Sequence, residues 1–470
     1  MLSPDFPVNP VVTKAWGFFY TLSLIPRPSL YEEQIRQWLI GLTEKNGWTY
    51  KLDEVRNIVI YVPGKGTLAD HEPLILQGHL DMVCEKDNAT KHDFYTEGLK
   101  LVNDGEWVSA TGTTLGADNG VAIAFALALA EEDFDNRLPL ELLFTMAEET
   151  GLIGAHGLQP ELLTGKTMIN IDTEDEGTFI IGCAGGEMVE ASFNTIGTEV
   201  QTVLDCELIG LKGGHSGLNV TTRHNAIITV GKILEQCSGV KLHVISAGDM
   251  DNAIPRSCKF TISGITESEL QKATESLFTE IKKTEPDVCL VSSVGTATQE
   301  LSVDTLKFLT SFKNGASSYH PDFKTIIETS SSLTVVKTKK GVITFFINTR
   351  SSSEVDKAAF NNEVEQLALS CKAIKVERNR VYPGWQPNKN SKILKACTEV
   401  YTDLYGQPPE ITSIHAGLEC GIIGEKINST EMVSMGPTIE HPHSPEERLN
   451  IKSFESVYLF LTKIIQNPVT

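Results

Sequence analysis

Short apolar runs alternate with helix-like stretches between residues 45 and 185, and this alternation constrains the fold more than any other feature of the sequence. The apolar runs NIVIYV, PLILQG, PLELLFTMA and KTMINID have the length and composition of strands, whereas GVAIAFALALAEE is typical of a helix. Strands that alternate with helices favour a doubly wound, mostly parallel sheet. We therefore expect an α/β domain in this part of the chain.

The pattern changes after residue 186. Segments such as VLDCELIGL, CKFTISGI and GVITFFINT are typical of antiparallel strands, and RHNAIITVGKILEQC and EVDKAAFNNEVEQLALS are amphipathic like helices. The stretch YPGWQPNKNS at 382–391 has the composition of a linker, and the residues after it return to apolar helix and strand patterns. We expect a discontinuous catalytic domain of residues 1–186 and 387–470, with an α+β domain of residues 187–386 inserted in it.

Charge and composition argue against several classes of partner. The chain of 470 residues has a formal net charge of -21, so it would repel nucleic acid and anionic membranes. The apolar run AWGFFYTLSLIP is too short to span a bilayer and lacks the features of a signal peptide, and we expect helices over residues 11–44, interrupted at PRPS. Nine cysteines without a C-x-x-C pair argue against a disulfide framework or a thiolate zinc site. A cytoplasmic protein is the expectation.

Five stretches place acidic residues or histidines after an apolar strand or in a Gly-marked turn: LILQGHLDMV, TTLGADNGVAIA, FTMAEETGLIGA, INIDTEDEG and GPTIEHPHSPEERL. In the first, His79 and Asp81 lie two residues apart. On extended backbone both side chains then share a face, where the carboxylate can orient a metal-bound imidazole. In the third, the adjacent carboxylates of Glu148 and Glu149 point in different directions, so one can bind metal while the other handles protons.

Asp118 in the second stretch and Asp172 in the fourth add further oxygen ligands. In open α/β sheets functional groups gather beyond the carboxyl ends of strands, so these side chains are expected to converge. Two histidines and three carboxylates could hold two divalent ions that share one carboxylate. Such ligands suit zinc, with manganese or cobalt as substitutes. Each stretch alone also fits a structural role, such as a helix cap or a solvated turn, and only the five together indicate a metal site.

The chain resembles the aminoacylase/carnosinase-type dinuclear metallopeptidases, and within that family the dipeptidase branch. The resemblance is carried by LQGHLDMVCEK, TTLGADNGVAIA, AEETGLIGA, GLKGGHSGLN, NAIPR, HAGLECGI and the GPTI and HSPEE segments, in the family's order from about residue 75 to 447. It implies metal-dependent hydrolysis of dipeptides with broad specificity, including dipeptides with C-terminal histidine. A tripeptidase, a deacylase of N-acyl amino acids and a non-catalytic relative that binds peptides or metal are the alternatives.

The resemblance also implies a ligand set. His79 and Asp172 would bind one ion, and Glu149 together with one histidine of the last stretch would bind the other. Asp118 would bridge the two ions. The peptide bond between Asp118 and Asn119 would be cis.

The resemblance implies catalytic roles for three further residues. Asp81 would orient His79. Glu148 would take a proton from the attacking water and return it to the leaving amine. His215 in KGGHSG would donate a hydrogen bond to the developing oxyanion. Without the resemblance, His215 is more typical of a turn histidine in a Gly-rich loop.

Substrate-binding residues are expected in and near the inserted domain. Arg350 ends the apolar strand FFINTR and matches the family's carboxylate-binding arginine, whose fork suits a carboxylate. Without the resemblance an arginine there is more typical of a surface charge. Asn252 and the HAGLECG stretch, with His415 and Gly417, are further candidates. The inserted domain would act as a lid over a dipeptide substrate and could mediate a homodimer.

The stretch GPTIEHPHSPEERL offers two histidines, His441 and His443. Ser444, Pro445 and Glu447 form an S-x-x-E capping box with proline at the first helical position, which predicts a helix directly after His443. A residue anchored at a helix start has the fixed direction that a metal ligand needs. The family's ligand is likewise the histidine before SP. We expect His443 to bind metal and His441 to lie at the rim of the pocket.

Overall fold

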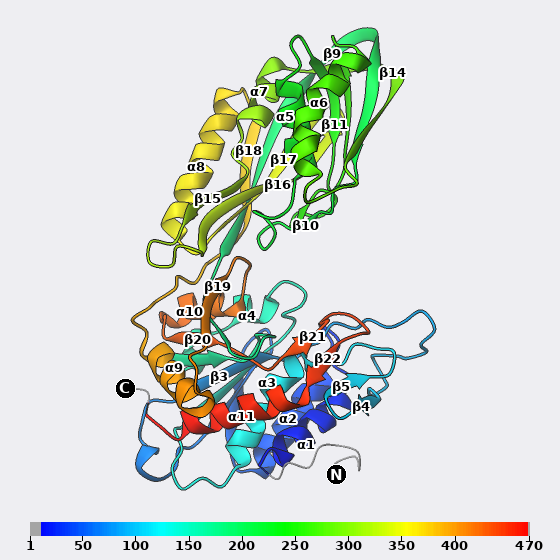
Figure 1. Ribbon diagram of the computed structural model, residues 1–470. Coiled ribbons are helices and arrows are strands. Elements are labelled where there is room, and N and C mark those ends of the chain that lie inside the picture. Colours follow the sequence, from blue (N-terminus) through cyan, green and yellow to red (C-terminus); the bar gives the residue numbers. More distant parts are fainter. Residues whose placement is uncertain (1–10, 469–470) are drawn as a thin grey trace. The chain divides into compact units, whose positions relative to one another are not determined.

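The computed structural model describes residues 11–468, which form two compact units (Figure 1). Of these residues, the first unit comprises 11–182, 385–413 and 418–468, and the second comprises 183–384 and 414–417. The sequence predicts breaks after residues 186 and 386, close to two of these boundaries, but it gives no sign that 414–417 belong to the second unit. Residues 1–10 and 469–470 of the expected catalytic domain lie outside the described residues.

A sheet of eight strands forms the centre of the first unit, in the order β1-β2-β6-β3-β7-β20-β8-β19. The four central strands β6, β3, β7 and β20 run parallel, whereas β1, β2 and β8 pair antiparallel with their neighbours. The predicted doubly wound, mostly parallel sheet is therefore confirmed. The strands are β1 (Thr49–Leu52), β2 (Ile58–Val62), β3 (Leu74–His79), β6 (Leu140–Thr145), β7 (Thr167–Asn170), β8 (Thr178–Cys183), β19 (Glu410–Ile414) and β20 (Met432–Ser434).

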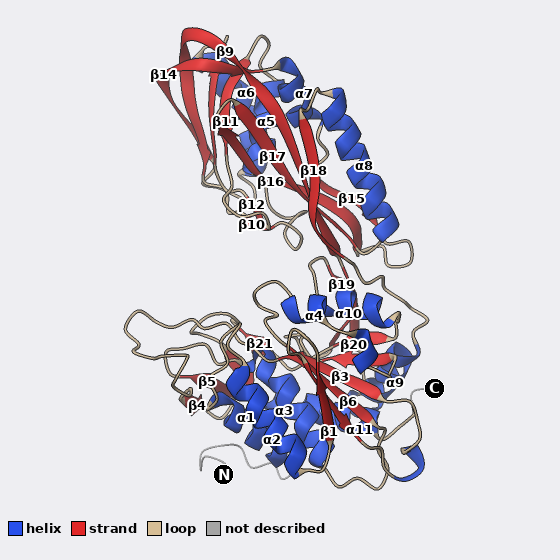
Figure 2. Ribbon diagram, turned by 180° about the vertical axis from the view of Figure 1, so that it is seen from behind, coloured by secondary structure: helices blue, strands red, loops and turns tan. Residues whose placement is uncertain are grey.

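Helices cover both faces of this sheet. Every residue of β3 and of β6 is buried, as expected for strands with helices on both sides. Helix α3 packs on β3 and β6, with α1 and α11 against it, and Figure 2 shows α4 and α10 on the other face. The helices are α1 (Thr13–Ser23), α2 (Glu33–Lys45), α3 (Ala117–Glu131), α4 (Ile153–Gly157), α9 (Lys392–Tyr405), α10 (Glu419–Ile427) and α11 (Ile451–Ile465), with 3-10 turns η1 (Gly66–Leu68) and η2 (Pro160–Leu162).

Helix α3 runs through the core and is apolar on all sides, as a fully buried helix must be. Three aromatic side chains anchor it to its neighbours. Trp16 of α1 stacks on Phe454 of α11 with ring centroids 3.8 Å apart, and Phe125 of α3 lies 4.5 Å from the same ring. All three are fully buried. These contacts hold α3, and with it the Asp118 turn, against two other helices.

The parallel strands bring their carboxyl ends to one edge of the sheet. His79 is the last residue of β3, while Glu148 follows β6 and Asp172 follows β7. Helix α3 begins at the same edge, because it connects the loop after β3 to β6. A fourth sheet strand, β20, leads to the turn that carries His443. The fold therefore gathers these segments where open α/β sheets place their functional groups.

The second unit is an antiparallel sheet with helices on one face, which agrees with the expected α+β domain. Its strand order is β11-β13-β9-β17-β16-β15, and β14 and β18 also pair with the long strand β9. Helices α5 and α8 pack on β9, and Figures 1 and 2 show the sheet from its two sides. Apolar side chains from strands and helices form one core.

The elements of the second unit have the following bounds: β9 (Gly185–Ile209), β10 (Gly214–His215), β11 (Lys241–Ser246), β12 (Ala253–Ile254), β13 (Cys258–Ser263), β14 (Cys289–Leu301), β15 (Gly315–Tyr319), β16 (Ile327–Lys339), β17 (Val342–Ser351), β18 (Lys375–Tyr382), α5 (Ala226–Glu235), α6 (Glu267–Ile281), α7 (Val303–Ser311) and α8 (Glu354–Ser370). A small separate sheet of the first unit contains β4 (Leu101–Asn103), β5 (Trp107–Ala110), β21 (Ile439–Glu440) and β22 (Arg448–Asn450).

The predicted helix after His443 does not form, so the capping-box prediction is wrong. The backbone N–H of Glu447 donates to the carbonyl oxygen of Ser444 at 3.0 Å, which closes a turn, and strand β22 follows. The next helix is α11, which is capped by the side chain of Asn450. The S-x-x-E pattern gives a wrong prediction here because the Glu447 carboxylate accepts backbone N–H groups of residues 115–118, and not one of its own segment.

All nine cysteines lie within residues 11–468, and no disulfide bond joins any of them. Within residues 11–468, no helix combines the length and the apolar character that crossing a membrane requires.

Replacing Phe454 by alanine should lower the free energy of unfolding of the first unit by about 3–5 kcal/mol, because it removes the ring shared by α1, α3 and α11. Leu459→Ala on the same helix is the control, since Leu459 is 36% exposed, and its effect should stay below about 1 kcal/mol. Urea unfolding followed by circular dichroism measures both. Equal losses would contradict the proposed anchoring of α3.

Candidate metal centre and active site

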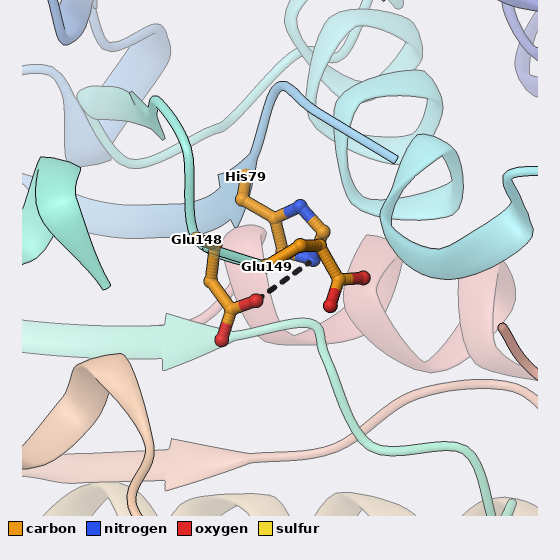
Figure 3. A group of neighbouring side chains, drawn as sticks. All are labelled: His79, Glu148 and Glu149. Atoms are coloured by element: carbon orange, nitrogen blue, oxygen red, sulfur yellow. Dashed lines mark ion pairs between the residues drawn. The ribbon is translucent and has the colours of Figure 1, made fainter. Parts of the chain in front are cut away.

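Potential metal ligands meet at the carboxyl edge of the first unit's sheet. Their ligand atoms lie within 4.8 Å of one another in three overlapping groups: His79, Glu148 and Glu149; His79, Asp118 and Asp172; and Asp118, Glu149 and His443. Figure 3 shows the first of these groups. The structure thus brings together all five ligands predicted from the sequence, and Glu148 with them.

The His79 ring lies between Asp81 and two other acidic side chains. Its Nδ1 is 3.3 Å from Oδ1 of Asp81, and its Nε2 is 2.9 Å from Asp118 and 3.5 Å from Asp172. Burial lowers the pKa of His79, but Asp172 and the hydrogen bonds to the three carboxylates outweigh burial and raise this pKa well above its usual value. Asp81 therefore fixes the ring through Nδ1 and leaves Nε2 facing the ligand group.

Asp118 is the member shared by two of the groups. Its Oδ1 lies 2.9 Å from Nε2 of His79, and its Oδ2 lies 3.0 Å from Nε2 of His443. Burial raises the pKa of Asp118, but the hydrogen bonds from the two imidazoles lower it below its usual range. The peptide bond between Asp118 and Asn119 is cis, as the resemblance implies. Because each oxygen faces a different histidine, the carboxylate has the arrangement of a bridging ligand.

Of the two histidines in the last stretch, His443 belongs to a ligand group and His441 to none. Nε2 of His443 lies 2.9 Å from Oε1 of Glu149. Hydrogen bonds to Asp118 and Glu149 raise the pKa of His443 to about 11. His441 is exposed, and both histidines have left-handed backbone conformations, with φ of 54° and 59°. The turn, and not a helix cap, sets the direction of His443.

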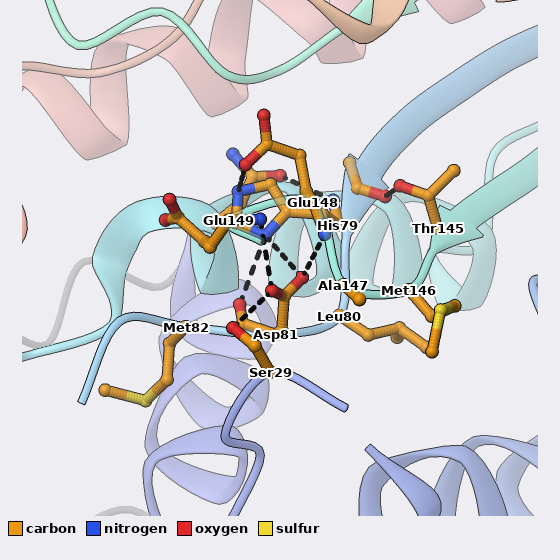
Figure 4. A network of polar contacts seen from close by, with 12 residues as sticks. Ser29, His79, Leu80, Asp81, Met82, Thr145, Met146, Ala147, Glu148 and Glu149 are labelled. Atoms are coloured by element: carbon orange, nitrogen blue, oxygen red, sulfur yellow. Dashed lines mark hydrogen bonds and ion pairs between the residues drawn. The ribbon is translucent and has the colours of Figure 1, made fainter. Parts of the chain in front are cut away.

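Glu148 lies beside His79, with its Oε2 4.0 Å from Nε2 of the ring (Figure 3). The loop that carries it is held by Asp81, whose two carboxylate oxygens accept the backbone N–H groups of Glu148 and Glu149 at 3.0 and 3.2 Å (Figure 4). Burial raises the pKa of Glu148 well above its usual value, against the opposing effect of His79. A buried carboxyl group with a raised pKa suits acid–base chemistry.

Glu447 holds the turn before α3, a role that its sequence position does not suggest. Its carboxylate accepts four successive backbone N–H groups of residues 115–118 at 2.8–3.3 Å. Burial raises the pKa of Glu447 to about 7, although these hydrogen bonds favour the ionised form. Gly116 has a φ of 68°, which lets the backbone fold around the carboxylate. The only sequence signal is that Glu447 lies four residues after His443.

A buried polar network, also missed from the sequence, links three of the parallel strands. Glu419 of α10 accepts hydrogen bonds from Gln77 at 2.6 Å and from Thr145 at 2.8 Å, and Asn170 donates to Gln77 at 2.6 Å. Burial raises the pKa of Glu419 to about 7. Polar residues at the last positions of otherwise apolar strands, as in LILQGH, LLFT and TMIN, were the available signal.

The ligand set fits divalent cations. Its donors are imidazole nitrogens and carboxylate oxygens, which suit zinc, manganese and cobalt. Burial raises the pKa values of Glu148, Glu149 and Asp172, and repulsion from neighbouring carboxylates raises them further. The same negative charge raises the pKa values of His79 and His443. Divalent cations bound at this site would neutralise the negative charge of the carboxylates.

The predicted substrate residues of the inserted domain form a separate cluster around Arg350 in the second unit. The guanidinium is buried at the end of β17, where Nη1 donates to the Tyr382 hydroxyl at 2.8 Å. Nη2 lies 3.4 Å from both Nε2 of His215 and Oγ of Ser216. Among residues 11–468, no carboxylate forms an ion pair with Arg350. A buried guanidinium without a counter-ion fits an anion-binding role.

The segment 414–417 packs against this cluster. Nε2 of His415 lies 2.7 Å from Oγ of Ser330. A Cβ atom on Gly217 would lie 2.0 Å from the carbonyl oxygen of His415, so only glycine fits there. A Cβ atom on Gly417 would lie 2.9 Å from the Tyr382 ring. These close approaches fix the backbone around the two histidines and the arginine.

Asn252 contributes to the cluster through its backbone, since its carbonyl oxygen accepts the N–H of Ser216 at 2.8 Å. Burial, and next to it the charge of Arg350, lower the pKa of His215 and of His415 to about 4. Both imidazoles are therefore neutral at neutral pH. A neutral imidazole can still donate one hydrogen bond.

We expect the buried imidazole of His415 to reduce stability as the pH falls from about 6.5 to about 4. In this window the unfolded chain binds a proton that the folded chain does not, so protonation favours unfolding, by up to ~1.4 kcal/mol per pH unit. His415→Gln removes this titration and keeps a polar partner for Ser330. Its melting temperature should fall less than that of the unmodified protein between pH 7 and pH 4. Equal falls would show that His415 does not titrate in this way.

His443→Gln should lower the number of bound divalent ions from about two per chain to one, because His443 is the only imidazole in the group with Asp118 and Glu149. His441→Gln is the matched control and should leave both ions bound. Metal analysis after dialysis against zinc measures the stoichiometry. Loss of an ion from the His441 variant alone would reverse the assignment.

Comparison with known proteins places the chain in a family. Residues 75–467 match the model of peptidase family M20/M25/M40. The chain is 35% identical to a cytosol non-specific dipeptidase of Escherichia coli (strain K12), over 480 residues that cover 96% of each chain. It superposes on the crystal structure of an aminoacylhistidine dipeptidase from Vibrio alginolyticus with a TM-score of 0.89, at 32% identity and 97% coverage of each chain.

An aminopeptidase from Bacillus cereus shares the fold alone, with a TM-score of 0.58 and 14% identity over 97% of this chain and 98% of that one. The family match and the full-length relatives agree with the ligand-rich edge of the sheet described above. The chain belongs to peptidase family M20/M25/M40 and is a peptide-bond hydrolase.

Proposed function

We propose that this protein is a dipeptidase of broad specificity that uses two divalent metal ions and accepts dipeptides with C-terminal histidine. The observation that carries this proposal is the position of Asp118 between His79 and His443, with Glu148 beside His79. The names of the two full-length relatives support the substrate class, since one is a non-specific dipeptidase and the other an aminoacylhistidine dipeptidase.

In this proposal, His79 and Asp172 would hold one ion, Glu149 and His443 would hold the other, and Asp118 would be a ligand shared by both. We propose zinc as the ion, with manganese or cobalt as substitutes, on the basis of the nitrogen and oxygen donors. When bound, such ions lower the pKa of a bound water, so that hydroxide is available at neutral pH, and they polarise a carbonyl oxygen. The ligand atoms within 4.8 Å of one another support this assignment.

The side chains around the ligands supply the proton transfers and the orientation. Asp81 keeps the ring of His79 in place through Nδ1. Glu148 would take a proton from the water as its oxygen bonds to the scissile carbonyl carbon, and would return this proton to the amine nitrogen as the C–N bond breaks. Glu148 is buried and its Oε2 lies 4.0 Å from Nε2 of His79, which supports this role. The proposal does not require Glu148 to bind an ion.

We propose that the Arg350 cluster recognises the substrate. The guanidinium would pair with a carboxylate of the dipeptide, and the neutral imidazole of His215 would donate a hydrogen bond to the oxyanion. His415, Gly417 and the backbone of Asn252 would shape the surroundings of these two groups. Two observations support this assignment: no carboxylate of the described residues pairs with Arg350, and Gly417 packs closely against the Tyr382 ring.

A homodimer formed through the second unit, a lid function for that unit and a cytoplasmic location belong to the same proposal. For the location, the support is the name of the E. coli relative, which describes that protein as cytosolic. For the homodimer and the lid, the support is the resemblance to the dipeptidase branch of the family.

The test is a substrate panel of Ala-His, other dipeptides, tripeptides and N-acetyl amino acids, with and without a chelator. We expect dipeptide hydrolysis that chelation abolishes and zinc restores. Glu148→Gln should lower kcat by about 10²–10⁴-fold, because it removes the proton acceptor. Glu446→Gln is the control, since Glu446 is exposed in the turn near His443, and it should keep full activity.

Activity that survives exhaustive chelation, or full activity of Glu148→Gln, would contradict the proposed mechanism. If only the N-acetyl amino acids are hydrolysed, the protein is instead a deacylase of the same family.

A further inference from the structure

Arg27 is buried between two loops of the ligand edge, although it lies in the segment between α1 and α2. Its Nη1 donates to the carbonyl oxygens of Leu80 at 3.1 Å and of Asp81 at 2.8 Å, and its Nη2 donates to the carbonyl oxygen of Gly116. Leu80 directly follows His79, and Gly116 lies two residues before the shared aspartate. One planar guanidinium thus ties the loop after β3 to the turn before α3.

Ser29 contacts the first of these loops through a side chain. Its Oγ donates at 2.8 Å to Oδ2 of Asp81, the carboxylate whose Oδ1 faces Nδ1 of His79. The backbone N–H of Met82 donates to the carbonyl oxygen of Arg27 at 3.2 Å, so the segment and the loop are also joined through their main chains. The hydroxyl therefore restricts the rotation of the carboxylate that orients the His79 ring.

Glu32 reaches a third loop, the one after β6. Its Oε1 accepts the backbone N–H of Ala147 at 2.9 Å and that of Leu30 at 3.0 Å, and the side chain is buried. Ala147 has a φ of 47°, a left-handed conformation that alanine rarely adopts, and it directly precedes Glu148. The hydrogen bond holds this conformation and so sets the direction of the loop.

We propose that residues 27–32 are a positioning element of the metal centre, in which Arg27, Ser29 and Glu32 hold three ligand-bearing loops in the arrangement that binds the ions. The three side chains contact backbone atoms and Asp81, not the ligand atoms, so they act through other residues. This inference deepens the proposed function and depends on it. Partners of metal ligands contribute about 10–100-fold to metal affinity or activity, which sets the size of the expected effect.

The test uses the full chain, stripped of metal, with zinc alone as the probe. Arg27→Lys keeps the charge but loses the planar fork, and Ser29→Ala removes a single hydroxyl group. Competition with a chromogenic chelator should show zinc binding weakened by about 10–100-fold in each variant. With zinc saturating, kcat should fall while KM for a dipeptide stays close to that of the unmodified protein.

Arg137→Lys is the matched control for Arg27. Arg137 is equally buried, with 2% exposure for each side chain, and its guanidinium donates to the carbonyl oxygens of Leu129, Ala130 and Pro63. These contacts lie at the opposite end of α3, roughly 18 Å along the helix from the first turn. Arg137→Lys should lower the melting temperature of the metal-free protein about as much as Arg27→Lys and leave zinc affinity unchanged.

Ser23→Ala is the control for Ser29, because the Oγ of Ser23 donates at 2.7 Å to the carbonyl oxygen of Tyr20 within α1. Ser23 is buried, whereas Ser29 is half-buried. The inference is wrong if Arg27→Lys or, should that variant not fold, Ser29→Ala binds zinc as tightly as the unmodified protein. It is also wrong if the two controls lose the same affinity. If the unmodified protein binds no zinc, the proposed metal centre itself fails, which distinguishes the two outcomes.

Discussion

The ligand edge of the first unit is centred on one carboxylate that contacts two imidazoles at once. Asp118 presents Oδ1 to His79 and Oδ2 to His443, which lie on segments more than 300 residues apart in sequence. Its turn cannot hold this position alone, because it begins a helix whose first N–H groups need acceptors. Glu447 supplies those acceptors, and the aromatic contacts of α3 fix the helix behind the turn. The position of Asp118 therefore depends on the packing of α3 and on the hydrogen bonds from the turn to Glu447.

The same edge of the sheet collects more negative charge than the folded chain neutralises. Burial raises the pKa values of Glu148, Glu419 and Glu447, while the neighbouring carboxylates raise those of His79 and His443. Such a cluster disfavours folding unless protons or cations compensate it. Divalent ions bound by these ligands would therefore contribute to stability as well as to chemistry.

Much of the site could be predicted because its ligands carry local signals. His79 ends a buried strand and Asp118 stands in a Gly-marked turn, and both positions can be found without long-range information. Glu447 and Arg27 could not be predicted, because they contact backbone atoms of distant loops, and such contacts leave no pattern near either partner. The S-x-x-E stretch even predicted a helix cap at Glu447, because a local rule cannot show that a carboxylate serves residues 329–332 positions away. The fold class followed from strand and helix patterns, whereas the passage of 414–417 into the second unit did not.

The most direct test of the central claim is a crystal structure of the zinc-loaded protein, with anomalous diffraction recorded on both sides of the zinc absorption edge. Two zinc peaks should flank the Asp118 carboxylate, one beside His79 and Asp172 and the other beside Glu149 and His443. A single peak, or two peaks without Asp118 between them, would contradict the account.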